Sequence, residues 1–90
     1  MVPTADDHDG EDSVAAIRAR MDEQRVVSEG VADRLIGLDE DEARRTAEGA
    51  ARLWRVVRRD DHRFPVSLEY ASKRINVEIE HGKIVSTSVG

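Results

Sequence analysis

The chain has 90 residues, of which 39% are hydrophobic and only three are aromatic, so it has room for one small domain with a modest aliphatic core. It contains no cysteine, which excludes a disulfide framework and a thiolate metal site. No apolar run approaches the ~18 residues that a membrane span needs.

The net charge of −5 belongs to one end of the chain. Residues 1–12 contain five acids and no Lys or Arg, which leaves 14 acids against 14 bases in the rest. We therefore predict a disordered acidic tail over 1–12. The balanced remainder offers no single-sign field for nucleic acid or acidic lipid.

The next segment predicts a helix and then an interruption. Ser13 is a suitable cap, and Val14, Ile17 and Met21 recur at helical spacing over 13–26. Ser28-Glu29-Gly30 is typical of a break, and 31–37 of a short turn that ends in glycine. This gives an N-terminal extension over 13–30 and a folded domain over 31–90.

A second helix is predicted over 39–52. Asp39 is a good cap, and Glu42 follows at capping-box spacing. A face of small residues permits close packing on a sheet; it comprises Ala43, Ala47, Ala50 and Ala51. The charged residues of this helix are expected to face water; they are Arg44, Arg45, Glu48 and Arg52.

Three strands are predicted after this helix, over 53–59, 74–80 and 83–89, with polar turns at 60–63 and 81–82. Because a long loop separates the first two strands, we expect them to lie parallel. Alternation in the second strand predicts that Ile75, Val77 and Ile79 are buried. The predicted fold class is α+β, with one main helix on a short mixed sheet.

The loop over 64–73 is the strongest candidate for function. Pro65 restricts an extended segment that runs from Val66 through Tyr70, with Leu68 at its centre. Proteases bind extended segments through backbone pairing and side-chain pockets. The alternative is an ordinary connection with Leu68 packed inward, and the residues alone leave both interpretations open.

Several motifs together resemble the potato inhibitor I family of serine protease inhibitors, including its bacterial and fungal elastase-inhibitor-like group. They are Leu35-Ile36-Gly37 before the acidic helix start at 40–45, Val66-Ser67-Leu68-Glu69-Tyr70, Arg74-Ile75-Asn76-Val77, and the terminal Val89-Gly90. The resemblance covers roughly residues 35–90. It implies a small α/β fold whose loop enters a protease active site as a substrate does.

The resemblance also implies roles for individual residues. Leu68 would precede the scissile bond and Glu69 would follow it, while Val66, Ser67 and Tyr70 would fill flanking subsites. Arg74 and Asn76 would support the loop, with Arg74 tied to the side chains of Ser67 and Glu69. Asn76 stands where the family usually has a second basic residue, Ala71 where an arginine often follows, and the cysteines of many bacterial members are absent.

Other function classes are less well supported. His8, His62 and His81 have no Ser or Cys partner at a recognisable spacing, so we expect no enzymatic activity, metal or cofactor. Acidic residues offset the Arg-rich run 52–63, and too few aromatic residues accompany it for a nucleic-acid site. The alternative function is a non-inhibitory interaction module with the same fold.

Cellular location and oligomeric state are less constrained. The absence of a signal peptide and of cysteine favours a cytoplasmic protein, while secretion after removal of a signal stays open. The sequence names neither the target protease nor an oligomeric state.

Overall fold

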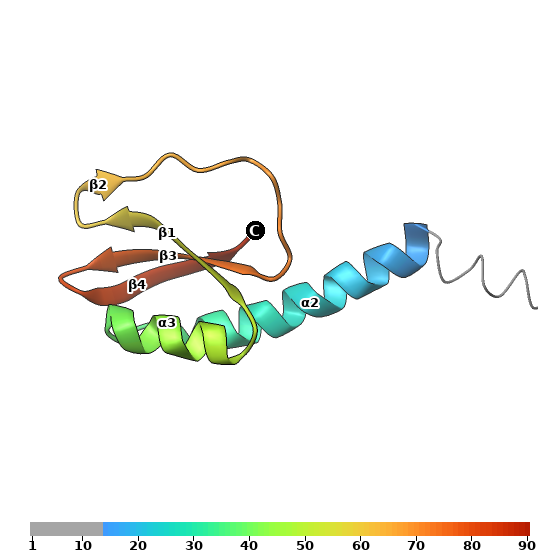
Figure 1. Ribbon diagram of the computed structural model, residues 1–90, viewed down its shortest axis with the longest axis horizontal. Coiled ribbons are helices and arrows are strands. Elements are labelled where there is room, and N and C mark those ends of the chain that lie inside the picture. The colour runs from blue at the N-terminus through green and yellow to red at the C-terminus, as the bar shows by residue number, and fades with distance from the viewer. Residues whose placement is uncertain (1–13) are drawn as a thin grey trace, which may run out of the picture.

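The computed structural model describes residues 14–90, and the predicted acidic tail over 1–12 lies outside these residues. Two helices precede four strands (Figure 1). The elements are α2 (Val14–Leu35), α3 (Glu40–Gly49), β1 (Leu53–Arg59), β2 (His62–Arg63), β3 (Arg74–Glu80) and β4 (Lys83–Val89). The result is a small α+β domain, as predicted.

The four strands form one mixed sheet in the order β2-β1-β3-β4. β1 and β3 are parallel, which confirms the prediction, and both outer pairs are antiparallel. The two-residue strand β2 was expected to be a turn. A register shift between Val56 and Arg58 interrupts the β1–β3 pairing. Such a bulge changes the direction of the side chains that follow it.

The core lies between the helices and one face of the sheet. Ile75, Val77 and Ile79 of β3 are fully buried, as the alternating pattern predicted. Trp54 and Val56 of β1 pack against this cluster. The remaining buried hydrophobic residues are Val31, Ala32, Leu35, Ala43, Ala47 and Ile84. We refer to this face as the covered face and to the opposite one as the open face.

α3 begins as predicted and ends earlier than predicted. The Asp39 carboxylate accepts a hydrogen bond from the Glu42 amide at 3.0 Å, which caps the helix. The helix ends at Gly49, and Ala51 is exposed with a φ of 60°. The expectation that Arg52 faces water is wrong, because this side chain is buried against α2.

The predicted break at 28–30 is also wrong, since α2 continues without interruption to Leu35. Ser28 is buried there, and its hydroxyl accepts a hydrogen bond from Arg52 at 2.9 Å. Tertiary packing thus outweighs the low helix propensity of Ser28 and Gly30. The glycine turn is shorter than predicted and lies at Gly37, whose φ of +88° favours glycine.

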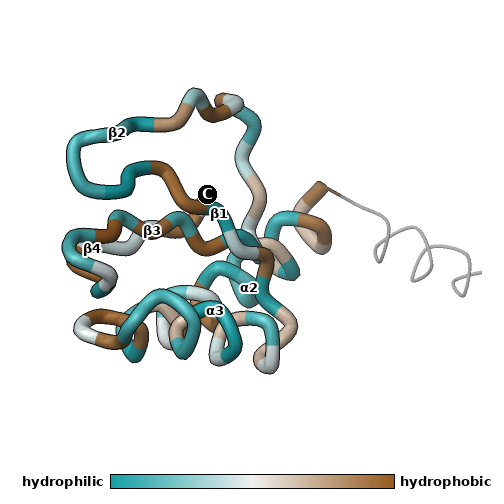
Figure 2. Tube along the Cα trace, turned by 60° about the vertical axis from the view of Figure 1, so that its left-hand side comes forward, coloured by the Kyte–Doolittle hydropathy of each residue, from teal (hydrophilic) through white to brown (hydrophobic). Residues whose placement is uncertain are grey.

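Two segments project from the compact part of the molecule. One is the N-terminal half of α2, and the other is the long loop that joins β2 to β3 (Figure 1). Figure 2 shows hydrophobic stretches on both segments. Within residues 14–90, no helix combines the length and the apolar character required to cross a bilayer.

Candidate functional site: the crossover loop and its support

The segment over 64–73, here called the crossover loop, carries its apolar side chains on the outside. Leu68 is 100% exposed, while Val66 and Tyr70 are 42% and 48% exposed. The alternative in which Leu68 packs inward is therefore wrong for this structure. Ser67 and Glu69, on either side of Leu68, are exposed as well. The loop presents a continuous accessible segment centred on Leu68.

The first end of the crossover loop is fixed to β1. The Phe64 amide donates a hydrogen bond to the Val57 carbonyl at 3.0 Å. The Phe64 ring meets the His62 ring edge-on at a centroid distance of 4.6 Å, and the Arg59 guanidinium lies 5.7 Å from its centroid. These contacts hold the chain where it leaves the sheet.

The second end is fixed to both a strand and a helix. The Leu53 amide donates to the Lys73 carbonyl at 2.8 Å, and the Ser28 hydroxyl donates to the Ser72 carbonyl at 2.7 Å. The Arg74 amide donates to the Ala71 carbonyl at 3.0 Å and closes a turn. α2 therefore positions the loop directly, which the sequence did not predict.

Arg74 connects the loop to the end of the described chain. Its guanidinium donates to the Glu69 carbonyl oxygen at 2.5 Å and to the backbone oxygen of Gly90 at 2.8 Å. The expected contact between Arg74 and the loop agrees with this geometry, but the contacting atom of the loop differs. Arg74 binds the main chain of Glu69, and within residues 14–90 it forms no hydrogen bond with the side chain of Ser67 or Glu69.

Asn76 forms hydrogen bonds with Arg55 and Gly90, which lie outside the crossover loop. Its amide nitrogen donates to Gly90 at 3.1 Å, while its amide oxygen accepts from Arg55 at 2.7 Å. Arg55 also reaches Gly90 at 3.4 Å. Three side chains from two adjacent strands thus converge on one backbone oxygen. We call Arg55, Arg74, Asn76 and Gly90 the latch.

The latch brings two guanidinium groups close together. Partial burial, and secondarily the positive charge of Arg74, lower the pKa of Arg55. An arginine stays protonated despite such a shift, so both charges persist around the Gly90 oxygen. The oxygen and the Asn76 amide dipole compensate them, which favours one fixed arrangement.

Tyr70 lies where the loop, the latch and α2 meet. The Tyr70 ring lies close to Gly90 of the latch. A Cβ atom placed on Gly90 would be 3.5 Å from the ring. Tyr70 also borders a hollow of about 310 Å³ on the side of α2. The other lining residues of this hollow are Val14, Ile17, Arg18, Met21 and Asp22.

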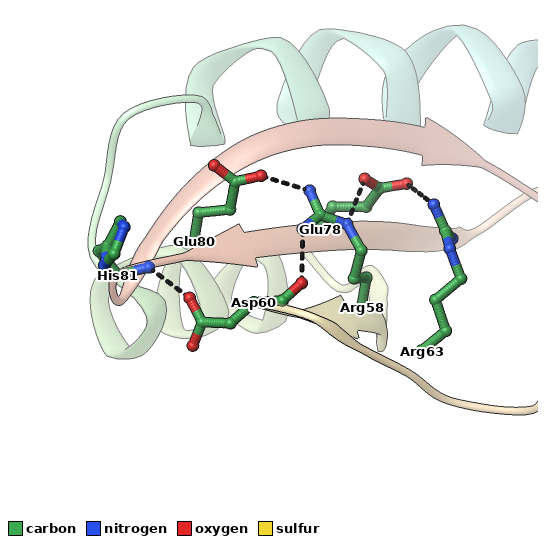
Figure 3. Close-up of polar contacts among 6 residues, drawn as sticks. All are labelled: Arg58, Asp60, Arg63, Glu78, Glu80 and His81. Carbon is green, nitrogen blue, oxygen red and sulfur yellow. Dashed lines mark hydrogen bonds and ion pairs between the residues drawn. The ribbon is translucent and has the colours of Figure 1, made fainter.

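A second polar network occupies the far end of the open face (Figure 3). Arg58 donates to Glu78 at 2.9 Å, to Glu80 at 2.8 Å and to the Asp60 carbonyl at 2.6 Å. These bonds to Glu80 and Glu78 raise the pKa of Arg58. The bulge in β1 directs Arg58 to this face. Because Arg58 is already satisfied by its neighbours, this network holds strands together and leaves little for a ligand.

Among the described residues, the histidines considered as catalytic or metal-binding residues do not gather into one site. His62 packs on Phe64, and the His81 amide donates to the Asp60 carboxylate at 2.9 Å. His8 lies outside the described residues. Within residues 14–90, no group of three or more His, Asp or Glu side chains is arranged to hold a metal ion.

Sequence reasoning missed two members of the latch. Arg55 lies opposite Asn76 in the parallel register, so the strand prediction combined with a register would have found it. Gly90 belonged to a motif of the family resemblance, but its role in the latch gave no signal, because a backbone oxygen plays it. Comparison with family models, curated proteins and solved structures finds no match to this chain. The family resemblance therefore stays a prediction.

Proposed function

We propose that the protein is a substrate-like inhibitor of subtilisin-type or chymotrypsin-type serine proteases, with Leu68–Glu69 as the reactive bond. One observation carries this proposal. Leu68 is fully exposed, while the carbonyl of the next residue is held by Arg74. An exposed anchor on a segment held in place before binding loses little conformational entropy on docking.

The side chain of Leu68 defines the class of protease. It is apolar and unbranched at Cβ, so it suits the apolar primary pockets of subtilisin and chymotrypsin. It offers no cation for the acidic pocket of trypsin. Val66 and Tyr70 are half-exposed on either side and are available for flanking subsites.

The contacts at both ends of the loop support slow release after cleavage. A cut between Leu68 and Glu69 would leave the new amino terminus tied through the Glu69 carbonyl to Arg74, and further along through Ser72 to Ser28. The new carboxyl terminus would stay attached through Phe64 to β1. Both ends then remain near each other, which favours religation over dissociation.

The proposal is tested by inhibition of peptide hydrolysis by subtilisin, chymotrypsin and trypsin. Leu68→Lys should move the preference toward trypsin, and Leu68→Gly should weaken binding by several kcal/mol, about the size expected for a central anchor. Val85 is exposed on β4, so Val85→Lys and Val85→Gly serve as matched controls. Absence of inhibition at micromolar concentration by the folded wild-type protein would contradict the proposal.

The alternative is a non-inhibitory interaction module that keeps this fold. It is favoured by the first half of the loop, where residues 65–68 form no hydrogen bond within the described part of the chain. A loop that is held no closer than Phe64 on the amino-terminal side of Leu68 would bind a partner without resisting cleavage. The same assay separates the two functions, because a module would be cut as a substrate or would leave the proteases unaffected.

A further inference from the structure

The apolar stripe of α2 extends beyond the part of the helix that the sheet covers. Positions 14, 17, 21, 24, 28, 31 and 35 alternate steps of three and four residues, which places them on one helix face. All of them are apolar except Gln24 and Ser28, which separate the exposed apolar end of the stripe from the buried one. Val31 and Leu35 are buried at one end of this stripe. Val14, Ile17 and Met21 at the other end are 67%, 46% and 43% exposed.

The exposed half of the stripe borders the candidate reactive segment. Tyr70 lines the same hollow as Val14, Ile17 and Met21, and it follows Leu68 by two residues. In Figure 1 the N-terminal half of α2 projects past the point where the crossover loop descends to β3. A protein bound to the loop on the C-terminal side of the Leu68–Glu69 bond would therefore also contact the N-terminal half of α2.

A second copy of this chain is a poor occupant of the stripe. A stable interface between two proteins buries about 800 Å² on each partner, from roughly 20 to 30 residues. Three side chains and one tyrosine fall far short of that. Arg18, Arg20 and Arg25 flank the stripe, so pairing two copies along it would set arginines against arginines.

The charged residues at the border of the stripe indicate which charge a partner bound there should carry. Arg25 already pairs with Asp22 at 3.8 Å and with Glu29 at 3.4 Å. Arg18 lines the hollow and forms no ion pair within residues 14–90. An apolar surface with a carboxylate at its border complements this arrangement.

We propose that the stripe formed by Val14, Ile17 and Met21 is a second contact surface for the serine protease that the loop engages. This inference rests on the proposed function. The loop supplies the anchor, and the stripe extends the contact from Tyr70 along α2 to an apolar patch of the protease bordered by an acidic group. The added contact acts mainly by slowing dissociation.

The test compares two double variants of the full chain on the same helix. Ile17→Ser/Met21→Ser alters the stripe, and Val26→Ser/Val27→Ser alters exposed positions of similar character away from the hollow. With subtilisin or chymotrypsin as the probe, we expect the stripe variant to raise the inhibition constant about tenfold, or about 1.4 kcal/mol. The control should match wild type, and circular dichroism should show equal helix content in both.

A charge reversal gives an independent measurement. Arg18→Glu should slow association at low salt, because it removes the attraction for the acidic border. Arg45→Glu on the exposed side of α3 should have a smaller effect. Equal association rates for the two variants would count against the acidic border.

Three outcomes would overturn the inference. If Leu68→Gly abolishes inhibition while both double variants match wild type, the stripe is no contact surface, although the inhibitor function holds. If wild type does not inhibit either protease, the proposed function fails and the inference fails with it. If wild type self-associates in sedimentation experiments and the stripe variant does not, the occupant is a second copy.

Discussion

The two faces of the sheet are built by different physical means. The covered face joins β3 to the helices through fully buried aliphatic side chains, including Ile75, Val77 and Ile79. The open face carries arginines, Asn76 and carboxylates that contact one another and the chain end. Apolar burial stabilises in proportion to area and has no directional requirement. Hydrogen bonds of guanidinium groups contribute less to net stability and fix atoms in one geometry.

This difference separates fold from candidate function. The covered face should determine whether the domain folds, and the open face should determine where the crossover loop lies. Neighbouring residues of one strand serve the two tasks, since Ile75 belongs to the core and Arg74 and Asn76 belong to the latch. The alternation of strand side chains makes this possible. The predictions below are arranged from the largest expected loss of stability to the smallest.

The largest effect is expected in the core. Ile75→Ala removes a fully buried side chain of the core cluster, and comparable substitutions cost about 2–5 kcal/mol. Urea denaturation should show this loss in the free energy of unfolding. Val85→Ala, exposed on the same sheet, should change it by less than about 0.5 kcal/mol. Equal losses from the two variants would refute the distinction between the faces.

A smaller loss is expected where the core meets the loop. Ser28→Ala removes the hydroxyl that donates to Ser72 and accepts from the buried side chain of Arg52. Leaving such groups unsatisfied costs about 1–3 kcal/mol. Ser86→Ala, on an exposed position of β4, is the control. Amide exchange should also quicken at Ser72 and Lys73, and unchanged exchange there would show that α2 does not position the loop.

The cap of α3 comes next in size. Asp39→Ala removes the acceptor for the Glu42 amide and should lower the free energy of unfolding by about 1 kcal/mol. Asp41→Ala keeps the cap and tests the charge of the first turn alone, so its effect should be smaller. Thermal denaturation of both variants decides this. Inhibition should stay unaltered in each, because within residues 14–90 no hydrogen bond or ion pair joins α3 to the latch.

The substitution of Arg74 should have a small effect on stability and a large effect on cleavage of the loop. Arg74→Ala should lower the free energy of unfolding by less than about 1 kcal/mol, since its bonds lie at the partly exposed open face. Cleavage of the Leu68–Glu69 bond by subtilisin should become faster, because the Glu69 carbonyl is no longer held. Arg63→Ala, which alters a 68% exposed side chain on β2, is the matched control.

Arg55 extends this test to the missed member of the latch. Arg55→Ala should also speed cleavage, though less than Arg74→Ala, because Arg55 bonds to Asn76 and Gly90 and, within residues 14–90, forms no hydrogen bond with the loop. Mass spectrometry of timed digests gives both rates. If Arg74→Ala and Arg63→Ala were cut equally fast, the latch would have no part in loop stability.

Much of the fold followed from local patterns. Alternation predicted that Ile75, Val77 and Ile79 are buried, although it did not predict the burial of Asn76 between them. The Asp39 spacing predicted the start of α3, and the length of the loop predicted that β1 and β3 are parallel. Each of these depends on neighbouring residues and on a fixed period of two or 3.6, which the sequence contains in full. The residues alone left the exposure of Leu68 open, and the structure shows this side chain fully exposed.

Other features required contacts between segments far apart in the chain. The sequence predicted a break at Ser28 and an exposed Arg52, whereas the two side chains bury each other across 24 residues and keep α2 continuous. The latch depends in the same way on the register that places Arg55 beside Asn76 and on the return of β4, which brings Gly90 to Arg74. Local propensity carries a few tenths of a kcal/mol per residue, and a buried hydrogen-bonded contact outweighs it. The sequence alone therefore determined β1, β3, β4, the start of α3 and the buried face of β3, and only the tertiary structure decided how far α2 runs and what holds the loop.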